Sequence, residues 1–354
     1  MESQSNALSD VPVVPRGIPL EVAVFSPENA IKAESKGAHR VQLNRPGSSD
    51  VGGLTPGLDY VKQLHMPQNP LHKKLDIPVR IMIRPRGPPG PYDREPQDYI
   101  YSEAEFQQMK DSITAFKDLR TMNPFRGDAF VFGILKRVHP LPPLAESSKK
   151  KYAASSSTSQ SSDGLSIASQ TTGTSISSVA SDSIPYYDSD DDSDDERQFV
   201  IDWNRCIELV RLALPIRCCF SRAFDAIAIQ QFHWRDSMVA LKEVGFTGVL
   251  TSGGPGTFLD NRENLLTMIS RLPDIQLVVT DGITSYNVQR LLKRVRYLKE
   301  KNLWTNSPCF YIAPLSEGAD PELVSMEEVD ALRHAQGIAD PEYYSPRPWR
   351  QIYH

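Results

Sequence analysis

The sequence contains few cysteines and no long apolar run. Its four cysteines, Cys206, Cys218, Cys219 and Cys309, form no CxxC pair and have no histidine-rich partner spacing, which excludes a zinc module and a disulfide framework. No stretch of about 18 apolar residues occurs, so the sequence predicts no membrane span. No basic segment followed by an apolar one begins the chain, which argues against export. We therefore expect the cytoplasm, with the nucleus left open.

The sequence also lacks an excess of basic residues. Its 39 Lys and Arg stand against 44 Asp and Glu among 354 residues, a formal net charge of −5. The acidic excess falls between Ser147 and Glu196, where 17 of the 50 residues are serine and the net charge is −6. The rest of the chain is nearly neutral, which excludes the basic field of a nucleic-acid-binding protein. The 40% apolar content predicts a sizeable core.

The acidic, serine-rich segment predicts a disordered insert over residues 138–198. It has too few large apolar residues to offset the entropy lost on ordering. In the run DSDDDSDDE, Ser189 and Ser193 are followed by acids, so phosphorylation there would add negative charge. A solvated spacer and a regulated docking segment both stay open. The polar residues 1–17 predict a disordered leader.

Short apolar segments alternate with helical ones along the remaining chain. Leu20–Phe25 is apolar and rich in branched residues, and Ser26 and Pro27 then supply a helix N-cap and first turn. Seven similar strand segments follow, at Arg40–Leu43, Val79–Ile83, Asp128–Ile134, Pro215–Phe220, Thr247–Leu250, Gln276–Val279 and Cys309–Ile312. Helical spacing of apolar residues appears in Gly57–Leu64, Ser102–Arg120, Asp202–Leu214, Ser237–Val244, Asn261–Leu272 and Ser285–Leu298.

Strands that are apolar throughout are typical of a parallel sheet covered by helices. Eight such units predict a (β/α)8 TIM-like barrel over residues 18–313, interrupted after the fourth strand by the insert and followed by a C-terminal tail, 314–354. Without leader, insert and tail the chain has about 250 residues, the usual size of this fold. A doubly wound open sheet is the structural alternative.

Polar and charged residues follow the predicted strands. In a parallel barrel the carboxyl ends of the strands meet at one mouth, where functional residues lie. The candidates are Arg84 and Arg86 after the third strand, Arg222 and Asp225 after the fifth, and Thr251 and Ser252 after the sixth. The three arginines predict a pocket for phosphate or carboxylate, because guanidinium groups bind such anions through paired N–H donors. Amides of residues 252–254 would assist, with Asp225 or Glu21 as acid or base.

A structural role for the same residues stays open. An inward-facing Glu21 would be a buried carboxylate that needs a cation, and Arg84 is the expected partner. An ion-pair network, for example between Arg222 and Asp225, would order the mouth without binding a ligand. We favour a ligand site for the cluster as a whole, because three arginines exceed the charge of two carboxylates.

Several local strings point to one family. They are LEVAVFS at 20–26, GAHRVQL at 37–43, GGLTP at 52–56, IPVRIMIRPRG at 77–87, FSRAFD at 220–225 and GVLTSGG at 248–254. Together they resemble the CutC copper homeostasis family from about residue 19 to 295, apart from the insert. The resemblance implies a (β/α)8 barrel, an intracellular location, a role in copper homeostasis and self-association into a homo-oligomer. It implies no particular reaction.

The chain departs from this family where copper ligands are expected. The resemblance implies cysteine on the first strand and at the end of the second, where this sequence has Ala23 and Asn44. The second-strand glutamate of the family is Gln42, and the histidine before RAFD is Ser221. Copper(I) prefers sulfur ligands, and neither Ala23 nor Asn44 supplies one. The chain has therefore lost the copper ligands that the resemblance implies at these two positions. Other sulfur candidates are Cys219, expected on the inner face of its strand, and Cys309.

Three functions stay open at this point. The first is a CutC-like protein that binds or handles copper(I). The second is a barrel enzyme acting on a small anionic metabolite at the predicted mouth. The third is an interaction protein that recruits partners through the acidic insert.

Overall fold

The computed structural model describes residues 18–65, 74–89, 98–138, 198–228, 234–271, 275–301, 308–313 and 322–339. The leader, residues 1–17, and the insert apart from its two ends lie outside the described residues.

Eight strands form a closed parallel barrel, which confirms the predicted fold and excludes the open sheet. The strands are β1 (Leu20–Val24), β2 (Arg40–Leu43), β3 (Val79–Met82), β4 (Ala129–Phe132), β7 (Arg217–Phe220), β8 (Phe246–Thr251), β9 (Gln276–Val279) and β10 (Cys309–Ile312). They follow one another around the barrel as β1-β10-β9-β8-β7-β4-β3-β2. Each of the eight predicted strand segments contains most of one of these strands. Their carboxyl ends therefore meet at one mouth.

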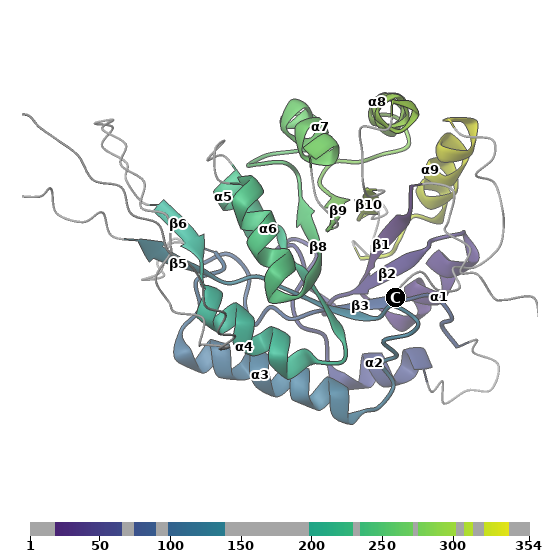
Figure 1. The fold of residues 1–354 in the computed structure, drawn as a ribbon. Coiled ribbons are helices and arrows are strands. Elements are labelled where there is room, and N and C mark those ends of the chain that lie inside the picture. Colours follow the sequence, from purple (N-terminus) through teal and green to yellow (C-terminus); the bar gives the residue numbers. More distant parts are fainter. Residues whose placement is uncertain are drawn as a thin grey trace, which may run out of the picture. The chain divides into compact units, whose positions relative to one another are not determined.

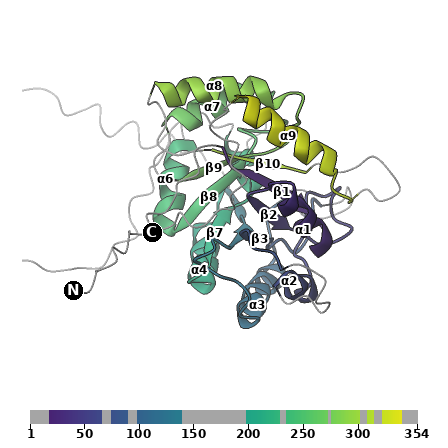
Figure 2. The ribbon, with the colours of Figure 1, turned by 90° about the vertical axis from the view of Figure 1, so that its right-hand side faces the viewer.

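Helices cover the outside of the barrel, as Figures 1 and 2 show. They are α1 (Pro27–Ser35), α2 (Leu58–His65), α3 (Glu103–Asp118), α4 (Trp203–Ala213), α6 (Trp234–Val244), α7 (Arg262–Arg271), α8 (Val288–Glu300) and α9 (Met326–Ala339). A 3-10 turn, η2 (Arg222–Phe224), and the short α5 (Asp225–Ala228) follow β7. The predicted cap at Ser26 is present, since its side chain accepts from the Asn29 backbone amide. Ser102 and Glu105 form a capping box at the start of α3. No described helix is both long and apolar enough to cross a membrane.

The two ends of the insert form a pair of strands that the sequence did not predict. β5 (Leu135–Val138) and β6 (Gln198–Ile201) make a two-stranded sheet between β4 and α4 in the chain. The insert therefore leaves the barrel after the fourth strand, as expected.

The region that we predicted as a C-terminal tail contains the eighth helix. Helix α9 follows β10 and packs against α8 and α1. Its buried residues Val329, Leu332 and Ala335 recur every three positions, a helical signal that the sequence already carried.

The strands bury both of their faces. Outward side chains pack under the helices in the main core. Inward side chains form a second apolar cluster inside the barrel, made of Met82, Val131, Cys219, Leu250, Val278 and Cys309. This inner cluster contains two of the four cysteines.

Candidate functional site

A buried ion-pair network lies inside the barrel at Glu21. The Oε2 atom of Glu21 accepts a hydrogen bond of 2.6 Å from Arg40 Nε and lies 3.1 Å from Arg80 Nη1. The exposed fractions of the Glu21, Arg40 and Arg80 side chains are 0%, 6% and 3%. Glu21 faces inward, the case in which we expected a buried carboxylate that needs a cation, but the predicted pairing with Arg84 is wrong. Arg40 and Arg80 sit beside Glu21 because β2 pairs with β1 and β3 pairs with β2.

Both inner thiols join the same network. Arg40 Nη2 donates to Cys309 Sγ at 3.1 Å, and Arg80 Nη1 donates to Cys219 Sγ at 3.3 Å. Gln276 Oε1 accepts from both guanidinium groups, at 3.2 and 3.4 Å. The structure therefore places Cys219 and Cys309, on strands that are distant in sequence, around one set of buried donors.

Burial keeps the two thiols protonated at neutral pH. It raises the pKa of Cys219 to about 11 and that of Cys309 to about 12, while Arg80 and Arg40 act in the opposite direction. A metal ion would have to displace the protons. Among the described residues, no group of three His, Cys, Asp or Glu side chains could hold a metal ion. The thioether of Met82, in the same cluster, is a further soft donor.

Asn44, at one of the two positions where the family resemblance implies cysteine, and Gln42, where it implies glutamate, form a hydrogen-bond network. Gln42 Nε2 donates to Asn44 Oδ1 at 3.2 Å and to the Tyr311 hydroxyl at 3.1 Å. Asn44 Nδ2 donates to the Gln42 backbone carbonyl at 3.1 Å. Ala23 is buried and has no polar side chain. These residues do not fit copper(I), because none supplies a soft ligand.

The arginines after β3 each bind a carboxylate at the mouth. Arg84 Nη2 lies 2.6 Å from Asp98 Oδ2, and its Nη1 donates to the Gly53 carbonyl at 2.9 Å. Arg86 Nε lies 2.7 Å from Glu105 Oε1. The expected excess of positive charge over carboxylates is therefore wrong for this pair of arginines. The sequence argument missed Asp98 because it lies in a loop without periodicity.

Arg222 lies between two carboxylates. Its Nη2 pairs with Asp281, and its Nε is 3.4 Å from Asp225 Oδ2, so the predicted Arg222–Asp225 pair is present but long. The Arg222 side chain is 40% exposed, whereas the Asp225 side chain is 9% exposed. An exposed guanidinium group above a buried carboxyl group gives the mouth a group that solutes can reach.

Asp225 occupies the donors that we predicted for a bound anion. Its Oδ1 accepts from Thr251 Oγ1 at 2.5 Å and from the Ser252 amide at 3.0 Å. The Ser252 hydroxyl donates to Oδ2 at 3.1 Å. Burial raises the Asp225 pKa to about 6, although these donors and Arg222 favour the charged form. Thr251 and Ser252 thus clamp Asp225 to the end of β8.

Two tyrosines near the mouth, Tyr99 and Tyr311, were not predicted from the sequence as site residues. The Arg84 guanidinium carbon lies 5.1 Å from the Tyr99 ring centroid. Burial raises the pKa of Tyr99 to about 12. Tyr311 lies on β10, where it pairs with Glu21 of β1 in the barrel. Only the tertiary structure shows that both residues lie near the mouth.

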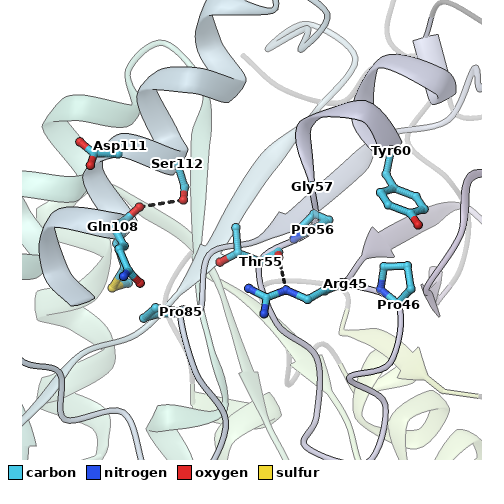
Figure 3. Close-up of a pocket in the computed structure, with 11 residues that line it drawn as sticks. Arg45, Pro46, Thr55, Pro56, Gly57, Tyr60, Pro85, Gln108, Asp111 and Ser112 are labelled. Carbon is cyan, nitrogen blue, oxygen red and sulfur yellow. Dashed lines mark hydrogen bonds between the residues drawn. The ribbon is translucent and has the colours of Figure 1, made fainter. Parts of the chain in front are cut away.

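The described residues also form a cavity of about 630 Å³ beside α3. In Figure 3, Gln108, Asp111 and Ser112 of α3 lie on one side, and Arg45, Pro46 and Tyr60 lie on the other. The other lining residues are Thr55, Pro56, Gly57, Pro85 and Met109. No predicted site residue lines this cavity.

The fold and these residues define a class of protein: a (β/α)8 barrel with charged side chains at its mouth and two buried thiols inside. The family model for the CutC family matches residues 18–137 and 195–301, more than half of the chain. The chain belongs to the CutC family.

Relatives and a solved structure agree with this assignment. The human copper homeostasis protein cutC homolog is 27% identical over 285 residues, which cover 78% of this chain and 70% of that protein. A CutC family protein from Treponema denticola is 25% identical and covers 78% of each chain. A crystal structure of a CutC protein from Streptococcus agalactiae has a TM-score of 0.52 at 19% identity, covering 84% of this chain and 99% of that one, which supports the fold.

Proposed function

We propose that this protein acts in copper homeostasis in the cytoplasm and binds copper(I) through Cys219 and Cys309. The observation that carries the proposal is their shared position in the inner cluster, together with Met82. Thiolate and thioether sulfurs are the ligands that copper(I) prefers. The role in copper homeostasis follows the names of the relatives in humans and mice.

The arginines beside the thiols support binding of an anionic sulfur pair. Each sulfur accepts from a guanidinium N–H, and charged donors stabilise a thiolate more than a thiol. Copper(I) would replace the thiol protons, so its affinity should rise with pH. The ligands would then lie on β7 and β10 instead of the first two strands, where Ala23 and Asn44 offer none.

An anaerobic titration against a chromogenic copper(I) chelator tests the proposal. The double variant Cys219→Ser and Cys309→Ser should bind copper(I) at least about tenfold more weakly than the wild type, since it keeps no thiolate in the cluster. Cys218→Ser is the matched control, because Cys218 is equally buried but belongs to the outer core. Equal affinity of the double variant and the wild type would reject direct binding at these thiols.

A second candidate is an enzyme or binding protein for a small anionic metabolite at the mouth. It is favoured by Arg222, which is 40% exposed and contacts Asp225, a carboxyl group suited to proton transfer near pH 6. A thermal-shift panel of phosphorylated and carboxylated metabolites, run on the wild type and Arg222→Ala, tests it. Stabilisation by a metabolite that disappears in the variant supports this function. No stabilisation by any anion counts against it.

Two further expectations stay predictions. Self-association into a homo-oligomer can be measured by light scattering of the full chain. Recruitment of partners by the acidic insert concerns residues outside the described ones. Deleting residues 147–196 should remove co-purifying partners if the insert recruits them.

A further inference from the structure

Three successive backbone N–H groups in the loop after β2 bind one carboxylate. The Gly47 amide donates to Glu322 Oε2 at 2.6 Å. The Ser48 and Ser49 amides donate to Glu322 Oε1 at 2.8 and 2.9 Å. Successive N–H groups that converge in this way form a nest, a concave site for anions. We refer to residues Gly47–Ser49 as the nest.

The nest is held in shape by bonds that do not involve Glu322. The Ser48 hydroxyl donates to the Arg45 carbonyl at 2.5 Å and accepts from the Leu54 amide at 3.1 Å. The Gly53 amide donates to the Ser48 carbonyl at 2.8 Å. Gly47 has φ +75°, a conformation that favours glycine and that gives the loop its concave turn. The three N–H groups therefore keep their direction when the carboxylate leaves.

The carboxylate comes from a distant and accessible segment of the chain. Glu322 lies 275 residues beyond Gly47 and just before α9. Its carbonyl accepts from Asn29 Nδ2 at 3.3 Å. Gly47 is exposed, Ser49 and Glu322 are partly buried and Ser48 is fully buried, so a solute approaches the nest from the Gly47 side.

We propose that the nest is an oxyanion site for a phosphate group and that Glu322 occupies it as an internal substitute. Phosphate offers three acceptor oxygens to the three N–H donors, whereas Glu322 offers two. A phosphate-bearing ligand and the segment of Glu322 would then compete for one site. Binding of the ligand would release the Glu322 side chain from the loop after β2. Phosphate binding at the nest does not depend on the proposed copper(I) site, because the nest contains no sulfur.

Titration of the full chain with inorganic phosphate at constant ionic strength tests the proposal. An internal carboxylate competes at an effective concentration on the order of millimolar, so Glu322→Ala should bind phosphate at least about tenfold more tightly than the wild type. Chloride should not replace phosphate, and acetate should bind more weakly. The matched control is Glu327→Ala, an exposed acid of α9 whose loss should leave phosphate binding unchanged.

A second substitution shows whether the nest itself binds the ion. Adding Gly47→Ala to Glu322→Ala should abolish the gained affinity, because alanine is strained at the positive φ of Gly47. If Glu322→Ala does not fold, Glu322→Gln keeps the side-chain shape without the charge, and its phosphate affinity should still exceed that of the wild type. Saturable binding lost with Gly47→Ala supports the proposal. Absence of saturable phosphate binding in both Glu322 variants overturns it.

Discussion

The cluster around Glu21 and the Arg222–Asp281 pair are both formed by arginine and carboxylate, but they differ in their access to solvent. Inside, Glu21 holds Arg40 and Arg80 with side chains no more than 6% exposed. At the mouth, Arg222 and Asp281 are 40% and 26% exposed. Water screens the Arg222–Asp281 pair but not the cluster around Glu21. The Glu21 cluster should therefore contribute to stability, whereas the charged groups at the mouth should respond to solutes and pH.

The largest expected effect of this difference is at Glu21. Glu21→Ala leaves two guanidinium groups buried beside each other, so the free energy of unfolding should fall by about 3–5 kcal/mol in urea denaturation. The control Glu103→Ala removes the exposed partner of Arg205 and should change stability little. A loss at Glu21 as small as that of the control would contradict the contrast between interior and mouth.

The pH dependence of stability should come from the mouth, through Asp225. Its pKa is about 6 in the folded protein against 3.8 in an unfolded chain. The folded state therefore holds the proton more tightly, and stability should fall as pH rises from about 4 to 6, by about 3 kcal/mol from this group. Urea denaturation across this range should show a smaller decline for Asp225→Asn than for the wild type. If the free energy of unfolding declined equally with pH in Asp225→Asn and in the wild type, other groups would cause the pH dependence.

A bulkier residue at Gly248 should disturb the interior directly. A Cβ atom there would lie 3.1 Å from Cys219 Sγ and 3.2 Å from the Gln276 carbonyl oxygen, which the sheet fixes. Gly248→Val should lower the free energy of unfolding by about 1–3 kcal/mol and should weaken copper(I) binding as well. Gly57→Val is a suitable comparison, because the nearest atom to its Cβ would be 3.6 Å away, on the Tyr60 ring. Unchanged stability of Gly248→Val would show a looser interior than the contacts indicate.

The smallest effect is expected at Asp281. Asp281→Asn removes the charge that faces Arg222 but keeps a residue that tolerates the positive φ of 66°. The free energy of unfolding should change by no more than about 1 kcal/mol, because the pair is partly exposed and burial, which raises the Asp281 pKa, offsets the attraction to Arg222. Added salt should reduce the difference in the free energy of unfolding between Asp281→Asn and the wild type. A loss as large as that of Glu21→Ala would remove the distinction between the two regions.

Most of the fold could be predicted from local sequence. Apolar segments such as Val79–Met82 mark strands because both of their faces are buried, and Ser102 with Glu105 marks the start of α3. The eighth helix, α9, was missed although its buried residues recur at helical spacing. The β5–β6 pair was missed because its two short strands border the polar, serine-rich insert and were counted as part of it or left without assignment.

The candidate site could be predicted only in part. Alternation along β2 places Arg40 on the same face as Gln42, and along β3 it places Arg80 on the same face as Met82, so both inner arginines carried a usable signal. Their pairing with Glu21 did not, because it depends on the register between strands.

The amino-acid sequence by itself determined the alternation of strands and helices, the place of the insert and the family. These depend on the polarity of residues close together in the chain. The tertiary structure decided which charges meet: Glu21 with Arg40 and Arg80 instead of Arg84, and Asp225 with Thr251 and Ser252 instead of a ligand. Closure of the barrel decides such partners, because it brings Cys309 to within 4.0 Å of Glu21, which lies 288 residues earlier.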